Sequence, residues 1–589
     1  MCGIFGYFHR DGRSLDAEVL AAMGDAIRHR GPDDRGVHAA VGMAIGNQRL
    51  SIIDIQGGHQ PFVSDDGQIV VVQNGEIFNH VELAEDLARA GHPCRTHSDT
   101  EVLLRLYESE GIGFLQKLNG MFAFAILDLR EHALYVVRDR IGVKPLYVHD
   151  DGRQLTFASE IKSILKAGMP RPAMDREALH HYLSFNYVPA PYTMYEGIRH
   201  LMPGHAMKVT RTGAQSWRWW NLAEIQPVHG RGEADWMEEF NAILEDAVRL
   251  RLRSDVPFGA FLSGGVDSST IVGLMARHMD EPVKTFCIGF HDPRYDEASF
   301  AQAAADRFGT RHKMERVDPD MLALWPTATY HCDQPHGDIS FLPTYRVSEL
   351  AVRDVKVVLT GDGGDELFAG YDKHRDFFAR PGAALLDDVA FHRSYFNSIS
   401  LFDEAGKRRL YGEAMHTSAG LPDSYEVARP WFEAVPHQDR INQALFLDMQ
   451  LLLSGNNLVK PDRMGMAVSL EARTPFLDWR MMEFAFRMPG DLKLRDGETK
   501  YLYKKAVAPL IGEDLAYRKK QMFTVPVGEW FRRNKADYCA RRLALLKNLD
   551  GFVDQEQAHR LLAEHVDGSR NHTREIRALI SLTHWMESC

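Results

Sequence analysis

The sequence predicts a two-domain protein, in which an α+β domain rich in sheet is followed by an α/β domain with a doubly wound parallel sheet. Three observations predict this class. The chain has 589 residues, and one hydrophobic core stops growing at about 250–300 residues, so more than one domain is required. Short strand-like segments dominate the sequence up to residue 170, and an order of strand, glycine-rich loop and helix repeats beyond residue 233.

The N-terminal part is expected to contain strands at 68–73, 122–128 and 133–138, because runs of apolar residues are bounded there by Gly, Asp and His turns. Two helices are expected at 17–28 and 81–90, where apolar residues recur near helical spacing. Together these elements indicate an α+β unit, and we place the first domain at residues 1–217.

The C-terminal part is expected to contain strands at 257–262, 283–290 and 356–359, each leading into a glycine-rich loop. Long helical stretches follow them, and strands that alternate with helices indicate a parallel sheet covered on both faces. Glycines and a tryptophan cluster interrupt all periodicity between residues 203 and 233. We therefore place the join there and the second domain at residues 235–589.

Composition narrows the classes of partner. The chain has 69 Lys and Arg residues against 81 Asp and Glu residues, a formal net charge of −12, and mixed charges of this kind give no footprint for nucleic acid. No stretch approaches the roughly 20 apolar residues of a membrane span. We expect a cytoplasmic protein with small-molecule partners, no nucleic acid and no membrane, and leave a homodimer open. Its six cysteines lack zinc-ligand spacing: Cys2, Cys94, Cys287, Cys332, Cys539 and Cys589.

Cys2 is the cysteine whose position suggests chemistry. Methionine is expected to be removed before this small residue, which would make Cys2 the amino terminus. An α-amino group has a pKa of about 7.7–8.0, so at neutral pH part of it can accept the thiol proton. Nucleophile and base would then belong to one residue, an arrangement suited to covalent catalysis.

Several short motifs that follow Cys2 add the groups that such a site needs. Acyl transfer from an amino-acid amide requires an oxyanion stabiliser, a cation for the α-carboxylate and an anion for the α-ammonium group. Asn74 and the adjacent Gly75 come directly after a strand, Arg49 precedes an apolar run, and Asp99 lies in a Ser-Asp-Thr-Glu motif. Asn74, Arg49 and Asp99 supply the three chemistries.

With these motifs the first two hundred residues resemble class II glutamine amidotransferases, whose glutaminase domain is an N-terminal-nucleophile hydrolase with four layers, α/β/β/α. The resemblance implies that Cys2 attacks the glutamine amide and that the Asn74 side chain and the Gly75 N–H form the oxyanion hole. It also implies glutamine-binding roles for a larger set of residues: Arg49, Ile53, Asn74, Gly75, Glu76 and Asp99.

Two loops in the C-terminal part are typical of a phosphate site. The run Ser263–Ser269 follows a strand and opens a helix, so glycines, N–H groups and the helix dipole can receive an anion. Unlike a Walker loop it has no Lys before its serines, and Asp267 within it makes sense if Mg²⁺ bridges the phosphates. The run Thr360–Tyr371, with glycines and acids after a strand, is predicted to be its partner.

These loops resemble the ATP-pyrophosphatase domain of asparagine synthetases over about residues 235 to 535. The resemblance implies that Asp267 and Asp365 bind Mg²⁺, that Lys500 meets the phosphates and that Asp362 handles the acyl intermediate. It implies ATP contacts at Leu262, Ser263, Gly264, Gly265, Asp267, Ser268, Ser269, Ile288, Thr360 and Gly361. Asparagine synthetases usually carry Glu where this chain has Asp362, one methylene shorter.

The two halves together predict glutamine-dependent, ATP-driven amidation of a carboxylate through an acyl-adenylate, with aspartate as the leading acceptor. An apolar passage between the sites is expected, because ammonia is protonated in water. Other acceptors stay open, namely sugar acids, peptides or osmolyte precursors. A β-lactam-synthetase-like cyclase would need no glutaminase, and a non-catalytic relative would have eroded loops, so the intact motifs argue against both.

Overall fold

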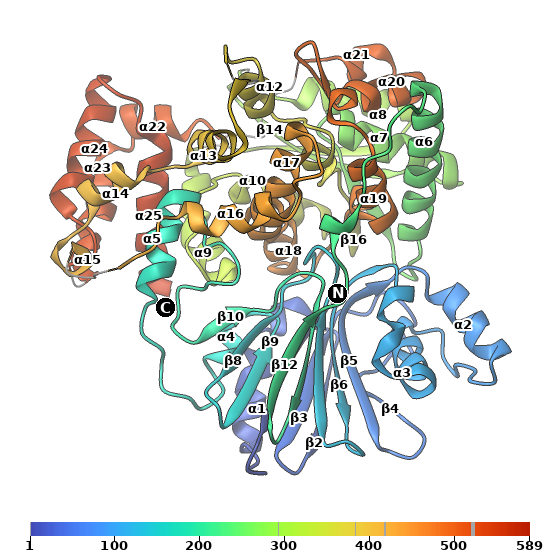
Figure 1. Ribbon diagram of the computed structural model, residues 1–589. Helices are drawn as coiled ribbons and strands as arrows, with labels where there is room; N and C mark the ends of the chain where they lie inside the picture. The colour runs from blue at the N-terminus through green and yellow to red at the C-terminus, as the bar shows by residue number, and fades with distance from the viewer. Residues whose placement is uncertain are drawn as a thin grey trace.

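The computed structural model describes residues 2–292, 294–317, 319–382, 385–416, 420–519, 525–549 and 551–588. Met1, whose removal the sequence suggests, and Cys589 lie outside this range. The described cysteines are all free thiols. Sheets make up the lower half of the molecule and helices most of the upper half (Figure 1). Within the described residues, no helix is both long enough and apolar enough to cross a bilayer.

Two six-stranded antiparallel sheets form the first domain. One has the order β10-β8-β9-β1-β3-β2 and the other the order β12-β11-β7-β6-β5-β4. The strands of the first sheet are β1 (Cys2–His9), β2 (Asp34–Ala40), β3 (Met43–Arg49), β8 (Tyr147–Asp150), β9 (Gln154–Ala158) and β10 (Ile198–His200). Those of the second are β4 (Phe62–Val63), β5 (Ile69–Ile77), β6 (Gly120–Asp128), β7 (Ala133–Arg138), β11 (His205–Thr210) and β12 (Gly213–Arg218).

The alternation of side chains along the strands produces four layers. In β1, Ile4 and Phe8 join a core that also contains Val70 and Val72 of the facing sheet, whereas Phe5 packs outward in another core with Met23. Successive residues of a strand point to opposite faces, so one strand serves two layers. Helices α1 (Ala17–Asp25) and α4 (Ile161–Ile164) cover one sheet, and α2 (His80–Arg89) and α3 (Asp99–Glu110) the other. The α/β/β/α prediction is confirmed.

The predicted strands of this domain are present, and β5 and β6 extend beyond the predicted ranges. The first predicted helix ends early, at Asp25, where a 3₁₀ turn over Arg28–Arg30 follows. Helix α3 was missed. Residues 99–107 are all buried, including the polar residues Asp99, Glu101 and Arg105, so the pattern of polar and apolar residues does not follow exposure as it does in a surface helix.

The second domain is built on a five-stranded parallel sheet with the order β15-β14-β13-β16-β17. Its strands are β13 (Phe258–Phe261), β14 (Lys284–Phe290), β15 (Arg311–Val317), β16 (Val357–Leu359) and β17 (Glu471–Arg473). Helices α6 (Glu233–Arg251), α7 (Val266–His278) and α20 (Tyr501–Ile511) share one core with the sheet. Helices α9 (Trp325–Cys332), α10 (Phe341–Ala351) and α18 (Val459–Met466) share the other, which confirms the doubly wound prediction.

Strand order reverses between β13 and β16, because the chain winds outward from β13 to β15 and then returns to β16 on the other side. Ligands of doubly wound sheets bind at the carboxyl ends of the strands beside this reversal. The two glycine-rich loops follow β13 and β16, so the topology brings both to one crevice.

Further helices surround this sheet. They are α8 (Ala298–Phe308), α11 (Gly364–Leu367), α12 (Asp372–Phe378), α13 (Asp388–Ile399), α14 (Glu404–Leu410), α15 (Glu413–His416), α16 (Tyr425–Glu433), α17 (Arg440–Leu447), a π-helix (Asp448–Asn457), α19 (Trp479–Arg487), α21 (Glu513–Ala516), α22 (Val527–Arg533), α23 (Ala536–Leu543), α24 (Gln555–Asp567) and α25 (Thr573–Ser588).

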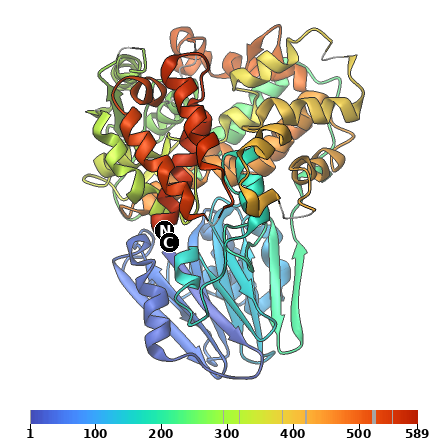
Figure 2. The same cartoon turned by 90° about the vertical axis from the view of Figure 1, so that its left-hand side faces the viewer.

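The halves of the molecule share an extensive contact. The last strand of the first domain ends at Arg218 and α6 begins at Glu233. Helix α5 (Arg176–Phe185) precedes that join, yet it packs among the helices of the second domain, and the Tyr182 hydroxyl donates to the carbonyl of Ala578 in α25 at 2.7 Å. Figure 2 shows the helical half resting on the upper edges of the sheets, with α5 between them.

Candidate active sites

Cys2 lies at the start of β1, opposite Arg49 of β3. Its N–H donates to Oδ1 of Asn74 at 3.1 Å, and its carbonyl accepts from Nε of Arg30 at 3.1 Å. The residue is buried. Burial raises the pKa of the Cys2 thiol, although the Asn47 side chain and the charge of Arg49 act in the opposite direction. Contacts from two sides therefore hold the backbone of the predicted nucleophile.

The predicted oxyanion residues lie beside Cys2 on β5. Asn74 is fully buried, and its Nδ2 lies 3.4 Å from Oγ of Ser159. Gly75 has φ +134°, and a Cβ there would lie 2.0 Å from the carbonyl oxygen of Met121 in β6. Only glycine permits this approach of two strands. Asn74 and Gly75 thus occupy a rigid position next to the thiol-bearing residue.

Arg49 and Asp99 are held by the backbone around them. The guanidinium of Arg49 donates to the carbonyls of Ile53 at 3.1 Å and Asp54 at 2.8 Å. Oδ2 of Asp99 accepts from the N–H of Ile77 at 2.9 Å, and it also accepts from a glutamine side chain of β5. Arg49 thus lies opposite Cys2 on the neighbouring strand, and Asp99 is held against β5.

Glu76 lies where the first site meets the second domain, and it is subject to the charges of both. Its Oε1 lies 3.7 Å from the guanidinium of Arg473 in β17. Burial raises the pKa of Glu76 well above its usual value, and the charges of Glu471 and Asp99 add to the effect. Glu76 and Asp99 both stay predicted ligands of the glutamine amino group.

A buried ionic cluster joins the Cys2 site to the second domain. Besides its bond to Cys2, Arg30 donates to Asp462 of α18 at 2.9 and 3.0 Å and to Glu160 at 2.9 Å. All three side chains are almost inaccessible to solvent. Two residues before Asp462, Lys460 lines the cavity of the second domain. Helix α18 thus contacts both sites.

The loop after β13 is shaped as a phosphate site. Gly264 has φ +70°, and a Cβ there would lie 2.3 Å from the backbone of Phe300, so the turn requires glycine. The hydroxyls of Ser263 and Ser268 lie 3.1 Å apart, and the N–H of Gly265 donates to Ser263 at 3.3 Å. Helix α7 starts at Val266. Hydroxyls and a helix N-terminus therefore meet at one point, which suits an anion.

Asp267, Asp365 and Lys500 converge from three distant segments. Nζ of Lys500 lies 2.6 Å from both oxygens of Asp267 and 2.7 Å from Oδ1 of Asp365. Burial opposes the charge of Lys500, but the two carboxylates outweigh it and raise the pKa of this amine. Mg²⁺ prefers one or two carboxylates completed by phosphate oxygens. Asp267 and Asp365, which already share the ammonium group of Lys500, therefore fit Mg²⁺.

The second loop can approach the first closely because its glycines carry no Cβ. A Cβ at Gly361 would lie 2.7 Å from Cβ of Asp267, and one at Gly364 would lie 2.6 Å from its Oδ1. A Cβ at Gly370 would lie 2.0 Å from Oδ1 of Asp365 and 2.2 Å from Cε of Lys500. The glycines of this loop are thus required by tertiary contact.

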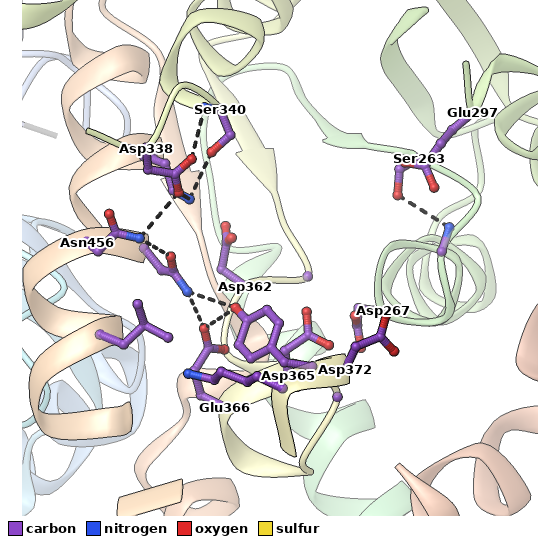
Figure 3. A pocket seen from close by; sticks show the side chains of 18 of the residues that line it. Ser263, Asp267, Glu297, Asp338, Ser340, Asp362, Asp365, Glu366, Asp372 and Asn456 are labelled. Atoms are coloured by element: carbon purple, nitrogen blue, oxygen red, sulfur yellow. Dashed lines mark hydrogen bonds and ion pairs between the residues drawn. The ribbon is translucent and has the colours of Figure 1, made fainter. Parts of the chain in front are cut away.

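Both loops open into one cavity of about 1380 Å³. Most of the predicted nucleotide and metal residues line it: Leu262, Ser263, Gly265, Asp267, Ser268, Ile288, Thr360, Gly361, Asp362, Asp365 and Lys500. Gly264 and Ser269 do not belong to that lining, and Ser269 is fully buried. Figure 3 shows Asp362 and Asp365 between Asp267 on one side and Asp338 and Asn456 on the other.

Asp362 lies near the middle of this cavity. Oγ1 of Thr360 donates to its Oδ2 at 2.6 Å. Burial raises the pKa of Asp362, the charges of Asp267 and Asp365 raise it further, and Thr360 and Lys460 act in the opposite direction. Among acids that share a site, one is favoured in its protonated form. Opposing charges within the cavity thus set the pKa of Asp362.

Several residues of the cavity were given no role by the sequence, namely Asp338, Ser340, Asn456, Lys460 and Arg577. Lys460 lies in α18, and Arg577 lies in α25, whose sequence carries no chemical signal. Their role depends on which helices pack together, and that information is not local.

The fold and the two sites define a glutamine-dependent ligase. A family model described as asparagine synthase matches residues 239–587, and one described as a glutamine amidotransferase domain matches residues 1–220. The chain belongs to the asparagine synthase family. Glutamine-hydrolyzing asparagine synthetase 1 of Bacillus subtilis (strain 168) is 33% identical over 99% of this chain and 96% of its own length. Asparagine synthetase 3 of the same strain is 30% identical over 94% of each chain.

A fungal relative carries a different name. Amidase chyE of Penicillium rubens is 27% identical over 90% of this chain and 89% of its own length. Similarity over nearly full length thus extends to proteins that are not named asparagine synthetases.

Proposed function

We propose that the protein transfers the amide nitrogen of glutamine to a carboxylic acid that ATP activates as an acyl-adenylate, with aspartate as the acceptor. The observation that carries this proposal is the meeting of Asp267, Asp365 and Lys500 at the switch point of the parallel sheet. Groups of this charge at a phosphate loop serve to bind a nucleoside triphosphate and to neutralise its leaving group.

In the first site, the sulfur of Cys2 attacks the amide carbon of glutamine. The Asn74 side chain and the Gly75 N–H stabilise the oxyanion, ammonia leaves with the proton taken from the thiol, and water later hydrolyses the thioester to glutamate. Burial raises the pKa of this thiol, so an adjacent base is needed, and an α-amino group freed by loss of Met1 would supply it.

In the second site, an oxygen of the acceptor carboxylate attacks the α-phosphorus of ATP. The bond to the bridging oxygen breaks and pyrophosphate leaves, with its charge stabilised by Lys500. Mg²⁺ held by Asp267 and Asp365 would supply further neutralisation of the phosphates. Ammonia then attacks the acyl carbon, AMP leaves with the bonding electrons, and Asp362 is placed to accept the proton that the nitrogen loses.

Ammonia has to travel between the sites without meeting solvent. Apolar side chains from both domains meet at the interface, namely Leu50, Ile52, Val357 and Met466. The ionic cluster of Arg30 and Asp462 lies beside Cys2 as well, so the proposed route has an apolar part and a charged part. The proposed route thus differs from the purely apolar passage that the sequence led us to expect.

A second candidate acceptor is another carboxylic acid with the same reaction. Asp362 favours it, because its carboxylate reaches less far than the Glu usual in asparagine synthetases. The relative named an amidase is consistent with a family whose members differ in acceptor.

Two variants measured together test the reaction. Cys2→Ala is expected to abolish glutamate release from glutamine and to preserve ATP-dependent pyrophosphate release with ammonia and aspartate. Asp267→Asn is expected to show the reverse pattern, because it removes a carboxylate at the phosphates and leaves the Cys2 site intact. Loss of both activities in either variant would contradict the proposal of two separate sites.

A further inference from the structure

The cavity of the second domain is larger than one nucleotide needs. Pockets for a single small ligand measure about 300–1,000 Å³, whereas this cavity measures about 1380 Å³. The phosphate loop takes up one side. On the other side of Asp362 lies a polar wall formed by Asp338, Ser340 and Asn456 (Figure 3). An acceptor whose carboxylate reaches the α-phosphorus must direct the rest of its structure toward that wall.

The carboxylate of Asp338 is fully engaged within this wall. Its Oδ2 accepts from Nζ of Lys460 at 2.7 Å and from Nδ2 of Asn456 at 3.3 Å. Its Oδ1 accepts from the N–H of Ser340 at 3.0 Å. The charge of Lys460 is thus balanced by Asp338, and little capacity remains at this carboxylate for a second cation.

A second cation nevertheless faces it. Arg577 lines the cavity and comes from α25, the last helix of the chain. One turn after Arg577, Oγ of Ser581 donates to the carbonyl of His336 at 2.8 Å. One turn further on, the indole of Trp585 donates to the carbonyl of Asp333 at 3.0 Å. Residues four apart lie on one helix face. The loop that carries Asp338 is therefore fastened to the face that carries Arg577.

Among the described residues, the opposite charge that acts most on Arg577 is that of Asp338, which Lys460 already pairs. Nε of Arg577 lacks a hydrogen-bond partner among these residues, and no ion pair with a described carboxylate is formed. Burial lowers the pKa of Arg577, and the charge of Asp338 opposes the effect. A partly buried guanidinium without a partner is costly, and a bound anion would offset the cost with paired hydrogen bonds.

We propose that Arg577 binds a second anionic group of the acceptor, so that the acceptor carries a negative charge besides the carboxylate that is amidated. This inference rests on the proposed function, because it assigns the substrate class of the same site. Because Asp338 already balances Lys460, the charge of Arg577 is additional at this end of the cavity. A guanidinium can bind a carboxylate or a phosphate through two parallel bonds. Arg577 is a residue that selects the acceptor and has no part in the bond changes.

Matched acids of different charge test the proposal. Binding of succinate and of butyrate to the full-length protein is measured by calorimetry with Mg²⁺ and a non-cleavable α,β-methylene analogue of ATP. Wild type is expected to bind succinate at least about tenfold more tightly, as one charge-assisted contact warrants. Arg577→Gln should lose this preference and Arg577→Lys should keep part of it, with the affinity for the ATP analogue unchanged.

Arg570→Gln is the control, because Arg570 is exposed, precedes α25 and does not line the cavity. The inference is overturned if wild type shows no preference for succinate, if Arg577→Gln keeps the preference, or if the ATP analogue binds more weakly to that variant. Pyrophosphate release with ammonia and a panel of acids separates the two proposals. Release without charge discrimination refutes the role of Arg577 alone, whereas no release from any acid refutes the proposed function.

Discussion

Gly370→Ala tests whether the close contact of the two loops sets the geometry of the ATP site. The added Cβ would lie 2.2 Å from Cε of Lys500, and carbon atoms in contact are separated by about 3.5–4.0 Å. Lys500 must therefore retreat by about 1.3 Å, and a misplacement of about 1 Å can cost about 10²-fold in rate. We expect kcat for ammonia-supported pyrophosphate release to fall about 100-fold.

Glutamate release from glutamine without ATP should stay within about twofold of wild type, because the Cys2 site makes no contact with Gly370. Gly113→Ala is a matched control, since no atom lies within 4 Å of its added Cβ and its φ is not positive. Pyrophosphate release is measured under saturating ATP and aspartate. A rate for Gly370→Ala within threefold of wild type would refute the view that this glycine positions Lys500.

Two further predictions concern the acceptor and the domain interface. Asp362→Glu extends the carboxylate by one methylene and is expected to raise aspartate-dependent pyrophosphate release severalfold; an unchanged acceptor profile would argue against aspartate. Burial, with the charge of His29 across the interface, lowers the pKa of His331 to about 3. Below about pH 6.5 only the unfolded state binds this proton, so stability falls by about 1.4 kcal/mol per pH unit toward pH 3. Melting midpoints at pH 7 and 5 should therefore differ less in His331→Gln than in wild type, and equal differences would exclude this role.

Much of the fold could be predicted because its signals are local. Strands β5, β6, β13 and β14 are apolar runs bounded by turn residues, and the order of strand, loop and helix indicates the parallel sheet. Helix α3 escaped prediction because polar residues such as Asp99, Glu101 and Arg105 are buried in it, so polarity does not mark its exposed face. Helix α5 illustrates a different limit, because nothing in residues 176–185 shows that they pack among helices of the other domain.

The candidate sites likewise contain features that the local sequence predicts and features that depend on tertiary packing. The chemical groups at Cys2, Asn74 and the Ser263 loop each lie within a few residues of one another, so these motifs can be recognised in the sequence. Glu76 has the residue type for binding an ammonium group, but its neighbour Arg473 belongs to the other domain and its pKa is raised by burial. The sequence therefore predicts that an acidic residue is present, but it does not predict the pKa of that residue in the folded protein.

By itself the sequence determined which groups are present and in which local conformations they are held: a thiol at the second position, a glycine-rich turn before a helix, and acids after a strand. Only the tertiary structure decided which of them meet. Lys500 reaches Asp267 across 233 residues of chain, and Arg577 of α25 lines the same cavity as the polar wall of Asp338, Ser340 and Asn456. The physical reason is that rotamer and turn preferences act over a few residues, whereas burial and Coulomb interactions depend on distances that only packing defines.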